Sequence, residues 1–286
     1  MNVYIVIPCY NEAAFIKGTL ESLLAQTVQA KQIVVVDDNS TDNSREIIHA
    51  FAKAYPEQIS LVHKKSSVGH APGSKVIAAF NEGLQTLDEN YDIICKFDAD
   101  LIFPSDYLEK IISAFTQNSK VGMVGGFCYI HKDGTWQLEN LTNKDHIRGA
   151  LKAYRKSCFT AIGGLKTAMG WDTVDELLAQ YHGWSIITDP SLHVKHLKPT
   201  GATYNAAAIA KQGVAFYRLR YGLFLTAIAS LKLALAKKKP MYFFKYLKAY
   251  LHAHRTKEPY LVTKKEGLFI RNLRWIGIKR KLLPFS

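Results

Sequence analysis

Short runs of β-branched residues alternate with longer amphipathic stretches over the first hundred residues, and this alternation constrains the fold more than any other feature of the sequence. The runs have the length of buried strands, and the stretches between them carry apolar residues at helical spacing. Strands and helices that alternate in this way form β-α-β units around a largely parallel sheet. The pattern predicts strands at residues 3–7, 33–36, 59–63 and 93–97, and helices at residues 12–26, 44–55 and 74–87.

Charge is distributed unevenly along the chain. The 286 residues carry 37 Lys and Arg against 24 Asp and Glu, a formal net charge of +13. Residues 1–194 hold 17 basic and 22 acidic side chains, whereas residues 195–286 hold 20 and 2. The total suggests nucleic acid or an anionic membrane as a partner, but the distribution describes an acidic body with a basic tail. We expect one α/β domain over residues 1–200 and a basic, largely helical region over residues 201–286.

The cysteines and the N-terminus both favour a cytoplasmic protein. Cys9, Cys95, Cys128 and Cys158 are too scattered for a disulfide framework or a zinc site, which favours a reducing compartment. Residues 1–8 have no basic start, and their apolar run is too short for the core of a signal peptide.

Two stretches of the tail have the composition of membrane-contacting segments. Residues 221–236 are apolar except for Lys232, but they are fewer than the roughly 20 residues of a bilayer span. Residues 241–254 place their larger apolar side chains on one helical face, namely Phe244, Leu247, Tyr250 and Leu251. A helix with an apolar stripe and a basic flank can lie in an anionic membrane interface or pack on its own domain. We expect peripheral contact with the inner face of the plasma membrane.

Polar groups follow three of the predicted strands at the point where each strand ends. They are residues 9–12 (CYNE), 37–38 (DD) and 98–100 (DAD). Ligands of open α/β sheets bind at the carboxyl ends of the strands, so these groups are expected to meet one polar ligand. Two carboxylates one residue apart, Asp98 and Asp100, suit Mg²⁺ or Mn²⁺, and such an ion can hold a diphosphate. A solvated turn is the alternative for such a pair taken alone.

In this order and spacing, residues 7–12 (IPCYNE), 35–42 (VVDDNSTD) and 96–100 (KFDAD) resemble the nucleotide-sugar glycosyltransferases of family 2. The resemblance covers about residues 1–200 and is specific, because three motifs agree. It implies the GT-A fold, with a mostly parallel central sheet, a nucleotide-binding half over residues 1–100 and an acceptor half over residues 101–200. It also implies a metal-dependent, inverting enzyme of the hexosyltransferase type. Such an enzyme moves a sugar from a UDP- or GDP-sugar to a hydroxyl acceptor.

The resemblance also implies roles on the donor side. Pro8, Tyr10 and Glu12 match the loop that lines the nucleoside site. Asp38 matches the acid that hydrogen-bonds the base. Asp98 matches the residue near the ribose, and Asp100 matches the residue that reaches the metal and the diphosphate. Lys75 stands where the family often has an Ala-Arg pair. It keeps a positive charge but lacks the bidentate fork of arginine. Either a contact to phosphate or a helix surface suits it.

The acceptor side resembles the family less closely. Residues 163–165 (GGL), 170–176 (GWDTVDE), 183–184 (GW) and 193–196 (HVKH) follow the family's order. Counting back from Gly183, Asp172 falls on the second acid of the family's acidic pair, and Trp171 replaces the first acid. The resemblance therefore implies that Asp172 is the base that takes the acceptor's proton, a role worth roughly 10² to 10⁴ in rate. Asp172 could instead cap the following helix.

Other residues of this half each leave two interpretations open. If residues 172–181 are helical, Asp172, Asp175 and Glu176 share one face, so Asp175 and Glu176 are surface acids or acids that support the acceptor side. Arg148 could contact the acceptor or a phosphate, or form an ordinary salt bridge. His196 could be a third metal ligand beside Asp100, because imidazole suits Mn²⁺, or it could be structural.

Two other classes of function compete with the glycosyltransferase. A sugar-phosphate nucleotidyltransferase shares the α/β layout but needs a glycine-rich first loop, and residues 8–12 contain no glycine. A non-enzymatic protein could bind nucleic acid or another anionic surface through the basic tail, but its acidic motifs would then have no use. We therefore expect a nucleotide-sugar donor, a glycan or lipid-linked acceptor of surface glycan or glycolipid assembly, and no nucleic acid.

Overall fold

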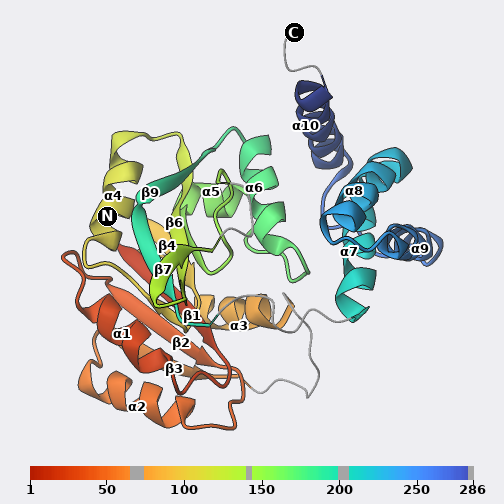
Figure 1. Cartoon of the computed structure of the whole chain (residues 1–286). Helices are drawn as coiled ribbons and strands as arrows, with labels where there is room; N and C mark the ends of the chain where they lie inside the picture. Colours follow the sequence, from red (N-terminus) through yellow and green to blue (C-terminus); the bar gives the residue numbers. More distant parts are fainter. Residues whose placement is uncertain (65–73, 140–143, 199–205, 283–286) are drawn as a thin grey trace. The chain divides into compact units, whose positions relative to one another are not determined.

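A computed structural model of the chain describes residues 1–64, 74–139, 144–198 and 206–282 (Figure 1). The chain divides into two compact units, Met1–Thr200 and Gly201–Ser286. The first unit holds the strands of a single sheet, and the second consists of helices. The two halves predicted within the first unit stay a proposal.

The first unit alternates strands and helices along its length. Its strands are β1 (Val3–Cys9), β2 (Gln32–Asp37), β3 (Ile59–His63), β4 (Ile93–Phe97), β5 (Leu101–Ile102), β6 (Val121–Lys132), β7 (Thr135–Leu138), β8 (Leu151–Arg155) and β9 (Ser185–His196). Its helices are α1 (Ile16–Leu24), α2 (Ser44–Ala54), α3 (Ser74–Leu84), α4 (Tyr107–Gln117), α5 (Lys156–Ala161) and α6 (Trp171–Tyr181).

The strands form one sheet in the order β3-β2-β1-β4-β8-β6-β9-β5, with β7 paired to β6. The β3-β2-β1-β4 half is parallel, as the alternation of strands and helices predicts. Beyond β4, the pairs β4–β8 and β8–β6 are antiparallel and β6–β9 is parallel, so most strands still point the same way. The predicted mostly parallel sheet is therefore confirmed.

Continuous apolar runs explain why β1 and β2 lie in the middle of the core. Both faces of these strands are buried, as expected for parallel strands covered by helices. Helix α3 packs closely on this pair at Gly83, where a Cβ atom would lie 2.6 Å from Val36 and 2.7 Å from Val6. The close approach therefore needs glycine at this position. Because β1, β2 and β4 are parallel neighbours, their carboxyl ends meet at one edge of the sheet.

The first helix is shorter than the predicted residues 12–26. The backbone N–H groups of Glu12 and Ala13 donate to Ser44 Oγ at 2.8 Å and Asp42 Oδ2 at 3.1 Å. These side chains hold the segment before α1 as a loop against the loop that follows β2. A tertiary contact thus outweighs the helical pattern of the sequence, and the loop keeps its polar groups at the sheet edge.

The second unit contains α7 (Ala206–Arg218), α8 (Gly222–Ala236), α9 (Met241–Arg255) and α10 (Lys264–Leu282). Helix α7 packs tightly on α9 at Gly213, where a Cβ atom would meet the carbonyl oxygen of Tyr246 at 2.3 Å. Helix α10 is anchored to the turn before α8, since Arg271 Nη1 donates to the carbonyl of Arg220 at 2.8 Å. Among the described helices, none combines the length and the apolar character needed to cross a bilayer.

Candidate active site

The loops after β1 and β2 bind each other and form one side of the site. Asn11 takes the left-handed conformation with φ 55°, which asparagine tolerates better than most residues. Its backbone N–H donates to Ser40 Oγ at 3.0 Å, and its side-chain oxygen accepts from the Thr41 N–H at 2.8 Å. This turn leaves the Tyr10 side chain 57% exposed at the edge of the sheet. Pro8 lies two residues before Tyr10, in strand β1, where it pairs with Val36 of β2.

Two acids beside these loops are largely withdrawn from solvent. Asp38 is buried, and its Oδ1 lies 3.2 Å from Lys64 Nζ. Glu12 Oε1 accepts from Lys198 Nζ, while Glu12 Oε2 is buried with no hydrogen-bond partner among the described residues. Burial raises the pKa of Glu12, and Lys198 opposes that effect. An unsatisfied buried oxygen indicates a place for a hydrogen-bond donor that the described part of the chain does not supply. Lys75 is the second residue of α3 and is half-buried.

The D-x-D segment follows β4 at the same edge. The Asp98 N–H donates to the carbonyl of Ala150 at 2.8 Å, and Asp98 Oδ1 accepts from the buried Lys96. Asp100 is buried, and its Oδ2 lies 3.4 Å from His196 Nε2. The pairing of β5 with β9 places Leu101 opposite His196 and so explains the contact. The structure brings together the two residues that the sequence proposes as metal ligands.

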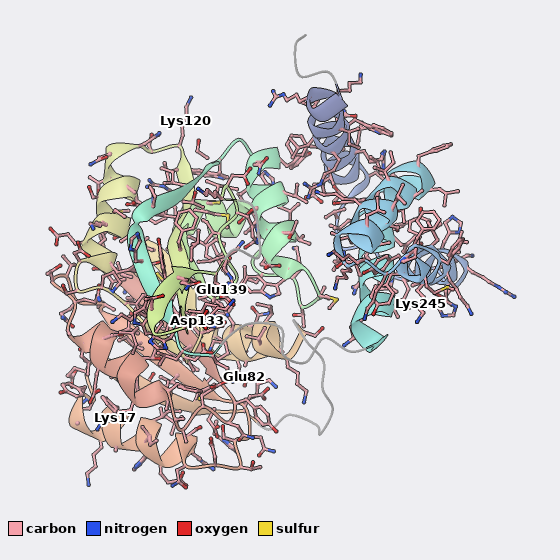
Figure 2. All side chains as sticks on the ribbon, viewed as in Figure 1. Lys17, Glu82, Lys120, Asp133, Glu139 and Lys245 are labelled. Atoms are coloured by element: carbon pink, nitrogen blue, oxygen red, sulfur yellow. The ribbon has the colours of Figure 1, made fainter. Side chains whose placement is uncertain are left out.

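Glu139 joins this cluster, although the sequence does not single it out. It directly follows β7 (Figure 2), and its Oε2 lies 2.9 Å from His196 Nδ1. The same oxygen accepts from Arg148 Nη1, so Arg148 forms a salt bridge in this structure. Burial alone would lower the pKa of His196, but the hydrogen bonds to Asp100 and Glu139 outweigh it and raise the pKa to about 9.

Two overlapping sets of residues could bind a cation, and both include His196. Asp100 and His196 offer a carboxylate oxygen and Nε2, while Cys128, Glu139 and His196 place one ligand atom each within 4.8 Å of one another. Burial raises the pKa of the Cys128 thiol to about 12, and Glu139 Oε2 is already engaged by Arg148 and His196. The first set suits Mn²⁺ or Mg²⁺ better, because these ions prefer carboxylate oxygen to a thiol, and the one carboxylate oxygen of the second set already bonds two other side chains.

Asp172 lies in the first turn of α6. Gly170 precedes the helix with φ 77° and occupies the N-cap position, so the alternative that Asp172 caps the helix is wrong. The side chain of Asp172 is 34% exposed, and its Oδ2 lies 3.6 Å from His146 Nε2. Burial alone would raise the pKa of Asp172, but the contact with His146, helped by Lys152, lowers it. The carboxylate is therefore ionised at neutral pH, as a base requires.

His146 connects the preceding loop to α6 and was not predicted. Its Nδ1 lies 2.8 Å from Glu176 Oε2, and the neighbouring Ile147 N–H donates to Glu176 Oε1 at 2.9 Å. Burial alone would lower the pKa of His146, but the carboxylates of Asp172 and Glu176 outweigh it and raise the pKa to about 9. Its ring is an imidazolium at neutral pH, with one carboxylate beside each nitrogen.

Lys152 of β8 holds the start of helix α6. This fully buried side chain lies 2.9 Å and 3.0 Å from the two oxygens of Asp175 and 3.0 Å from Glu176 Oε1, and it also donates to the carbonyl of Asp172. Asp175 and Glu176 are therefore not surface acids. Asp175 is 2% exposed, so its carboxylate is closed to an acceptor in this structure. The alternative that Asp175 supports the acceptor side without touching the acceptor fits this burial, and that role stays a prediction.

Trp171 is buried between the donor-side and acceptor-side groups. The register of β4 and β8 pairs Lys96 with Lys152, and their Nζ atoms lie 5.5 Å and 5.8 Å from the centre of the Trp171 ring. Ammonium groups at this range are attracted to an aromatic face. The ring also needs Gly149, where a Cβ atom would lie 2.8 Å from Trp171 Cζ2. An aromatic residue at the position of the family's first acid thus packs with two buried cations.

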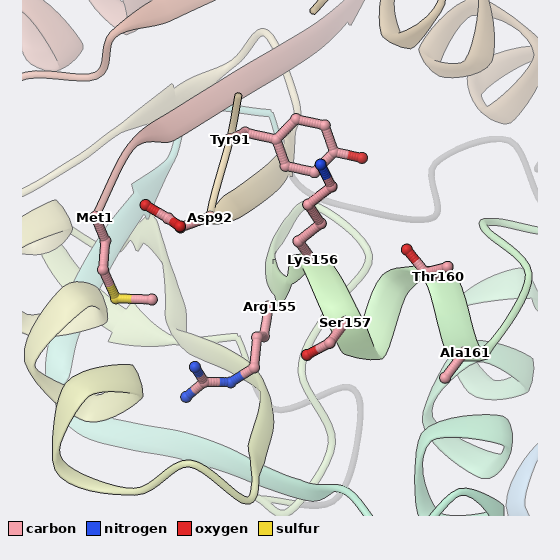
Figure 3. Close-up of a pocket in the computed structure, with 8 residues that line it drawn as sticks. All are labelled: Met1, Tyr91, Asp92, Arg155, Lys156, Ser157, Thr160 and Ala161. Atoms are coloured by element: carbon pink, nitrogen blue, oxygen red, sulfur yellow. The ribbon is translucent and has the colours of Figure 1, made fainter. Parts of the chain in front are cut away.

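A separate shallow pocket lies away from these groups (Figure 3). It is lined by residues that precede β1 and β4 or that surround the end of β8, including Met1, Asp92 and Arg155. Because β8 is antiparallel to β4, these positions all belong to the opposite edge of the sheet. Arg155 there donates to the carbonyls of Val121 and Phe115, so its guanidinium is engaged in structural bonds.

The sheet and the acidic groups at its carboxyl edge define the class of the protein. The mannosyltransferase PcManGT from Pyrobaculum calidifontis, in complex with GDP-Man and Mn²⁺, has a similar structure, with a TM-score of 0.60, 19% identity and coverage of 97% of this chain and 80% of that chain. Staphylococcus aureus TarS 1-349 in complex with UDP-GlcNAc gives a TM-score of 0.56, with 15% identity over 90% of this chain and 73% of that one. The chain has the GT-A glycosyltransferase fold, as the sequence motifs predicted.

The sequence comparisons name the family. The family model Glycosyl transferase family 2 matches residues 4–167, and the chain belongs to that family. Over 121 residues it is 31% identical to poly-beta-1,6-N-acetyl-D-glucosamine synthase of Staphylococcus epidermidis, a match that spans 42% of this chain and 27% of that protein. The minor teichoic acid biosynthesis protein GgaA of Bacillus subtilis is 28% identical over 145 residues, or 49% of this chain and 31% of that protein. The matched region thus spans about a third or less of these relatives.

Proposed function

We propose that the chain is a metal-dependent, inverting glycosyltransferase that moves a sugar from a UDP- or GDP-sugar to a hydroxyl acceptor. The observation that carries the proposal is the pairing of Lys96 with Lys152 across β4 and β8. Lys96 holds Asp98 of the donor side, and Lys152 holds the start of the helix that bears Asp172. Because Lys96 and Lys152 are neighbours across the sheet, their contacts support a single site that has a donor side and an acceptor side.

The donor side offers a set of groups for a nucleoside diphosphate. We assign Pro8, Tyr10, Glu12, Asp38 and Asp98 to the nucleoside, and Lys75 to the diphosphate. Asp100 and His196 would hold Mn²⁺ or Mg²⁺. Their donor atoms, 3.4 Å apart, fit two ligands of one ion. A divalent ion bound there would stabilise the negative charge of the leaving diphosphate.

On the acceptor side, Asp172 is the proposed base. Its carboxylate takes the proton of the acceptor hydroxyl while that oxygen bonds to the anomeric carbon of the sugar. The bond from this carbon to the diphosphate oxygen breaks, its electron pair leaves with the nucleoside diphosphate, and the configuration inverts. His146 holds Asp172 ionised and oriented. Trp171 and Asp175 support the helix start, and Arg148 acts through its salt bridge to Glu139.

Membership of family 2 favours this function over a sugar-phosphate nucleotidyltransferase. The names of the relatives, a polysaccharide synthase and a teichoic acid biosynthesis protein, support a role in surface glycan or glycolipid assembly with a glycan or lipid-linked acceptor. The complexes of the structural neighbours support a UDP- or GDP-sugar as the donor. We also propose that the basic second unit brings the enzyme to the inner face of an anionic membrane.

A panel of nucleotide sugars tests the enzyme. The purified chain is incubated with each donor in the presence of Mn²⁺ or a chelator, and release of free nucleoside diphosphate is measured. We expect release from one donor class that stops with chelator and with Asp100→Ala. Asp106→Ala, which removes a partly exposed acid at the start of α4, should keep wild-type rates. Absence of release from every donor would contradict the proposal, and equal rates with chelator would contradict the metal.

A further inference from the structure

Helix α8 exposes most of its large apolar side chains and buries mainly small or polar ones, whereas a helix in a water-soluble bundle usually does the opposite. Its buried side carries one large apolar residue, Leu225, and three small or polar residues four apart, Thr226, Ser230 and Ala234. Most of its larger apolar residues face outward, among them Phe224 at 80% and Leu235 at 66% exposure. In water, packing of large apolar side chains inside a bundle drives folding, so this orientation gives up stability. Small residues between helices and large apolar residues outside are typical of helices that contact lipid.

The outward residues form a continuous stripe. Phe224, Ile228, Leu231 and Leu235 recur at three- and four-residue intervals, which places them along one side of the helix, and all four are exposed. We call these four residues the α8 face. Lys232 is the one charged residue within α8. At about 22 Å, a helix of 15 residues is shorter than the roughly 30 Å hydrocarbon core of a bilayer, so it would lie in the surface rather than cross it.

Basic residues lie next to this face. Lys237, Lys238 and Lys239 directly follow α8, and all three are exposed. Residues 201–286 carry 18 Lys and Arg against 2 Glu. A positive charge of this density beside an apolar stripe is complementary to anionic lipid headgroups above acyl chains. The same charge opposes association with a second copy of the chain, which would bring two strongly basic units together.

We propose that the α8 face and Lys237–Lys239 dock the protein on an anionic lipid bilayer. The apolar side chains enter the boundary between headgroups and acyl chains, and the lysines contact the phosphates. This assignment differs from the stripe predicted for residues 241–254. There, Tyr250 is buried and packs against Tyr217 with ring centres 5.8 Å apart, so α9 uses part of its apolar face inside the unit.

Vesicle flotation tests the proposal with the full chain. The protein is mixed with phosphatidylcholine vesicles that contain or lack phosphatidylglycerol, at low and high salt, and the bound fraction is measured. We expect strong binding to the anionic vesicles at low salt, weaker binding at high salt because the surface charge is screened, and little binding to the neutral vesicles. Equal binding to both vesicle types, or no binding to either, would overturn the proposal.

Two sets of variants separate the apolar and the charged contributions. Lys237→Gln, Lys238→Gln and Lys239→Gln together should weaken partitioning roughly 100-fold, at about fivefold for each lysine. The matched control replaces Lys17, Lys53 and Lys120, exposed lysines of the first unit, by glutamine and should bind as the wild type does. An equal loss in both triple variants would mean that total charge, rather than this site, causes binding.

The apolar part is tested with Phe224→Ser and Leu235→Ser combined. We expect at least a tenfold loss of vesicle binding, because both side chains leave water on docking. The control Tyr55→Ser removes an exposed ring of the first unit and should bind normally. Nucleoside diphosphate release in solution should stay at wild-type rates in all these variants, so loss of docking and loss of the proposed enzyme activity are separate results.

Two further measurements identify other occupants of the α8 face. Sedimentation without lipid reports the oligomeric state, and urea denaturation reports stability. A wild-type oligomer that Phe224→Ser dissociates would show that the face binds a second copy of the chain. A loss of stability in the serine variants would show that the face is buried within the chain. Either result would overturn the proposal, whereas a monomer of unchanged stability supports it.

Discussion

The charge state of Asp172 depends on one neighbouring side chain. His146 lies 3.6 Å away and carries a positive charge at neutral pH, because Asp172 and Glu176 raise its pKa to about 9. A carboxylate beside this imidazolium stays ionised although it is partly withdrawn from solvent. The same contact fixes the direction in which the proposed base points, which is a requirement for proton transfer from a positioned hydroxyl.

Replacement of this base should separate transfer from binding. In Asp172→Asn, we expect transfer to fall by roughly 10² to 10⁴, because an amide takes no proton at neutral pH, while donor affinity stays within about twofold. Transfer rates and donor binding by calorimetry check both parts. Asp106→Asn removes a partly exposed carboxylate of the same unit and serves as the control. An equal loss of binding and transfer would assign Asp172 a structural role instead.

Glu139 is expected to tune the proposed metal site through His196. It holds the His196 ring from the side opposite Asp100, an arrangement that in metal sites orients the imidazole. We expect Glu139→Gln to raise the Mn²⁺ concentration for half-maximal activity by roughly 10- to 100-fold, with activity restored by excess Mn²⁺. Glu82→Gln, at an exposed position of α3, is the control. An unchanged Mn²⁺ requirement would rule out this positioning role.

At the scale of elements, α6 depends on the loop that precedes β8. His146 and Ile147 of this loop bond Glu176, and Lys152 of β8 bonds Asp175 and Glu176. The helix start that bears Asp172 is therefore held by charges from two other segments. Buried charges of this kind give a defined geometry only while every partner is present.

The stability of this contact should depend on pH. The pKa of His146 rises on folding from the ordinary 6.5 to about 9, so its protonated form stabilises the fold fully below pH 6.5. This contribution is lost as the pH rises through about 9. We expect His146→Gln to lower the free energy of unfolding by up to about 3 kcal/mol near pH 6 and by much less above pH 9. Urea denaturation of both proteins across this range measures the difference, and a difference that does not vary with pH would contradict the assignment.

Lys152 should be the larger contributor to stability. Lys152→Met leaves Asp175 and Glu176 buried without their cation, and we expect a loss of about 3 to 5 kcal/mol in the free energy of unfolding. Lys156→Met, four residues further on, removes a lysine whose partner Glu89 is exposed, and it should cost much less. The two losses are compared by urea denaturation at neutral pH. Similar losses in the two variants would show that the buried ion pairs of Lys152 add little to the stability of the fold.

At the scale of the whole molecule, the two units have separate chemistry. Every residue assigned to the proposed site lies in Met1–Thr200, whereas the α8 face and its lysines lie in Gly201–Ser286. The proposed site draws on acidic side chains of the first unit, whereas the second unit carries an excess of basic side chains. The net charge of +13 is thus the sum of an acidic first unit and a strongly basic second unit.

Removal of the second unit should therefore separate docking from chemistry. A chain that ends at Thr200 is expected to lose vesicle binding, because it lacks the α8 face and the excess basic residues. It should still release nucleoside diphosphate from its donor in solution. Flotation and product release are measured on the same preparation, and circular dichroism confirms that the shortened chain is folded. A folded chain without any product release would show that the second unit contributes to the chemistry.

The parallel half of the sheet, the acids at its carboxyl edge and the separation of charge could be predicted from the sequence, because they depend on local pattern and on the order of strands. Counting along the family motif also singled out Asp172. The partners of these residues follow from the three-dimensional fold alone. Glu139, His146 and the Lys96–Lys152 pair come from segments far apart in the sequence, and isolated residues of these types carry no local signal. The outward direction of the α8 face was decided in the same way, because the sequence of an apolar helix does not indicate which side its neighbours cover.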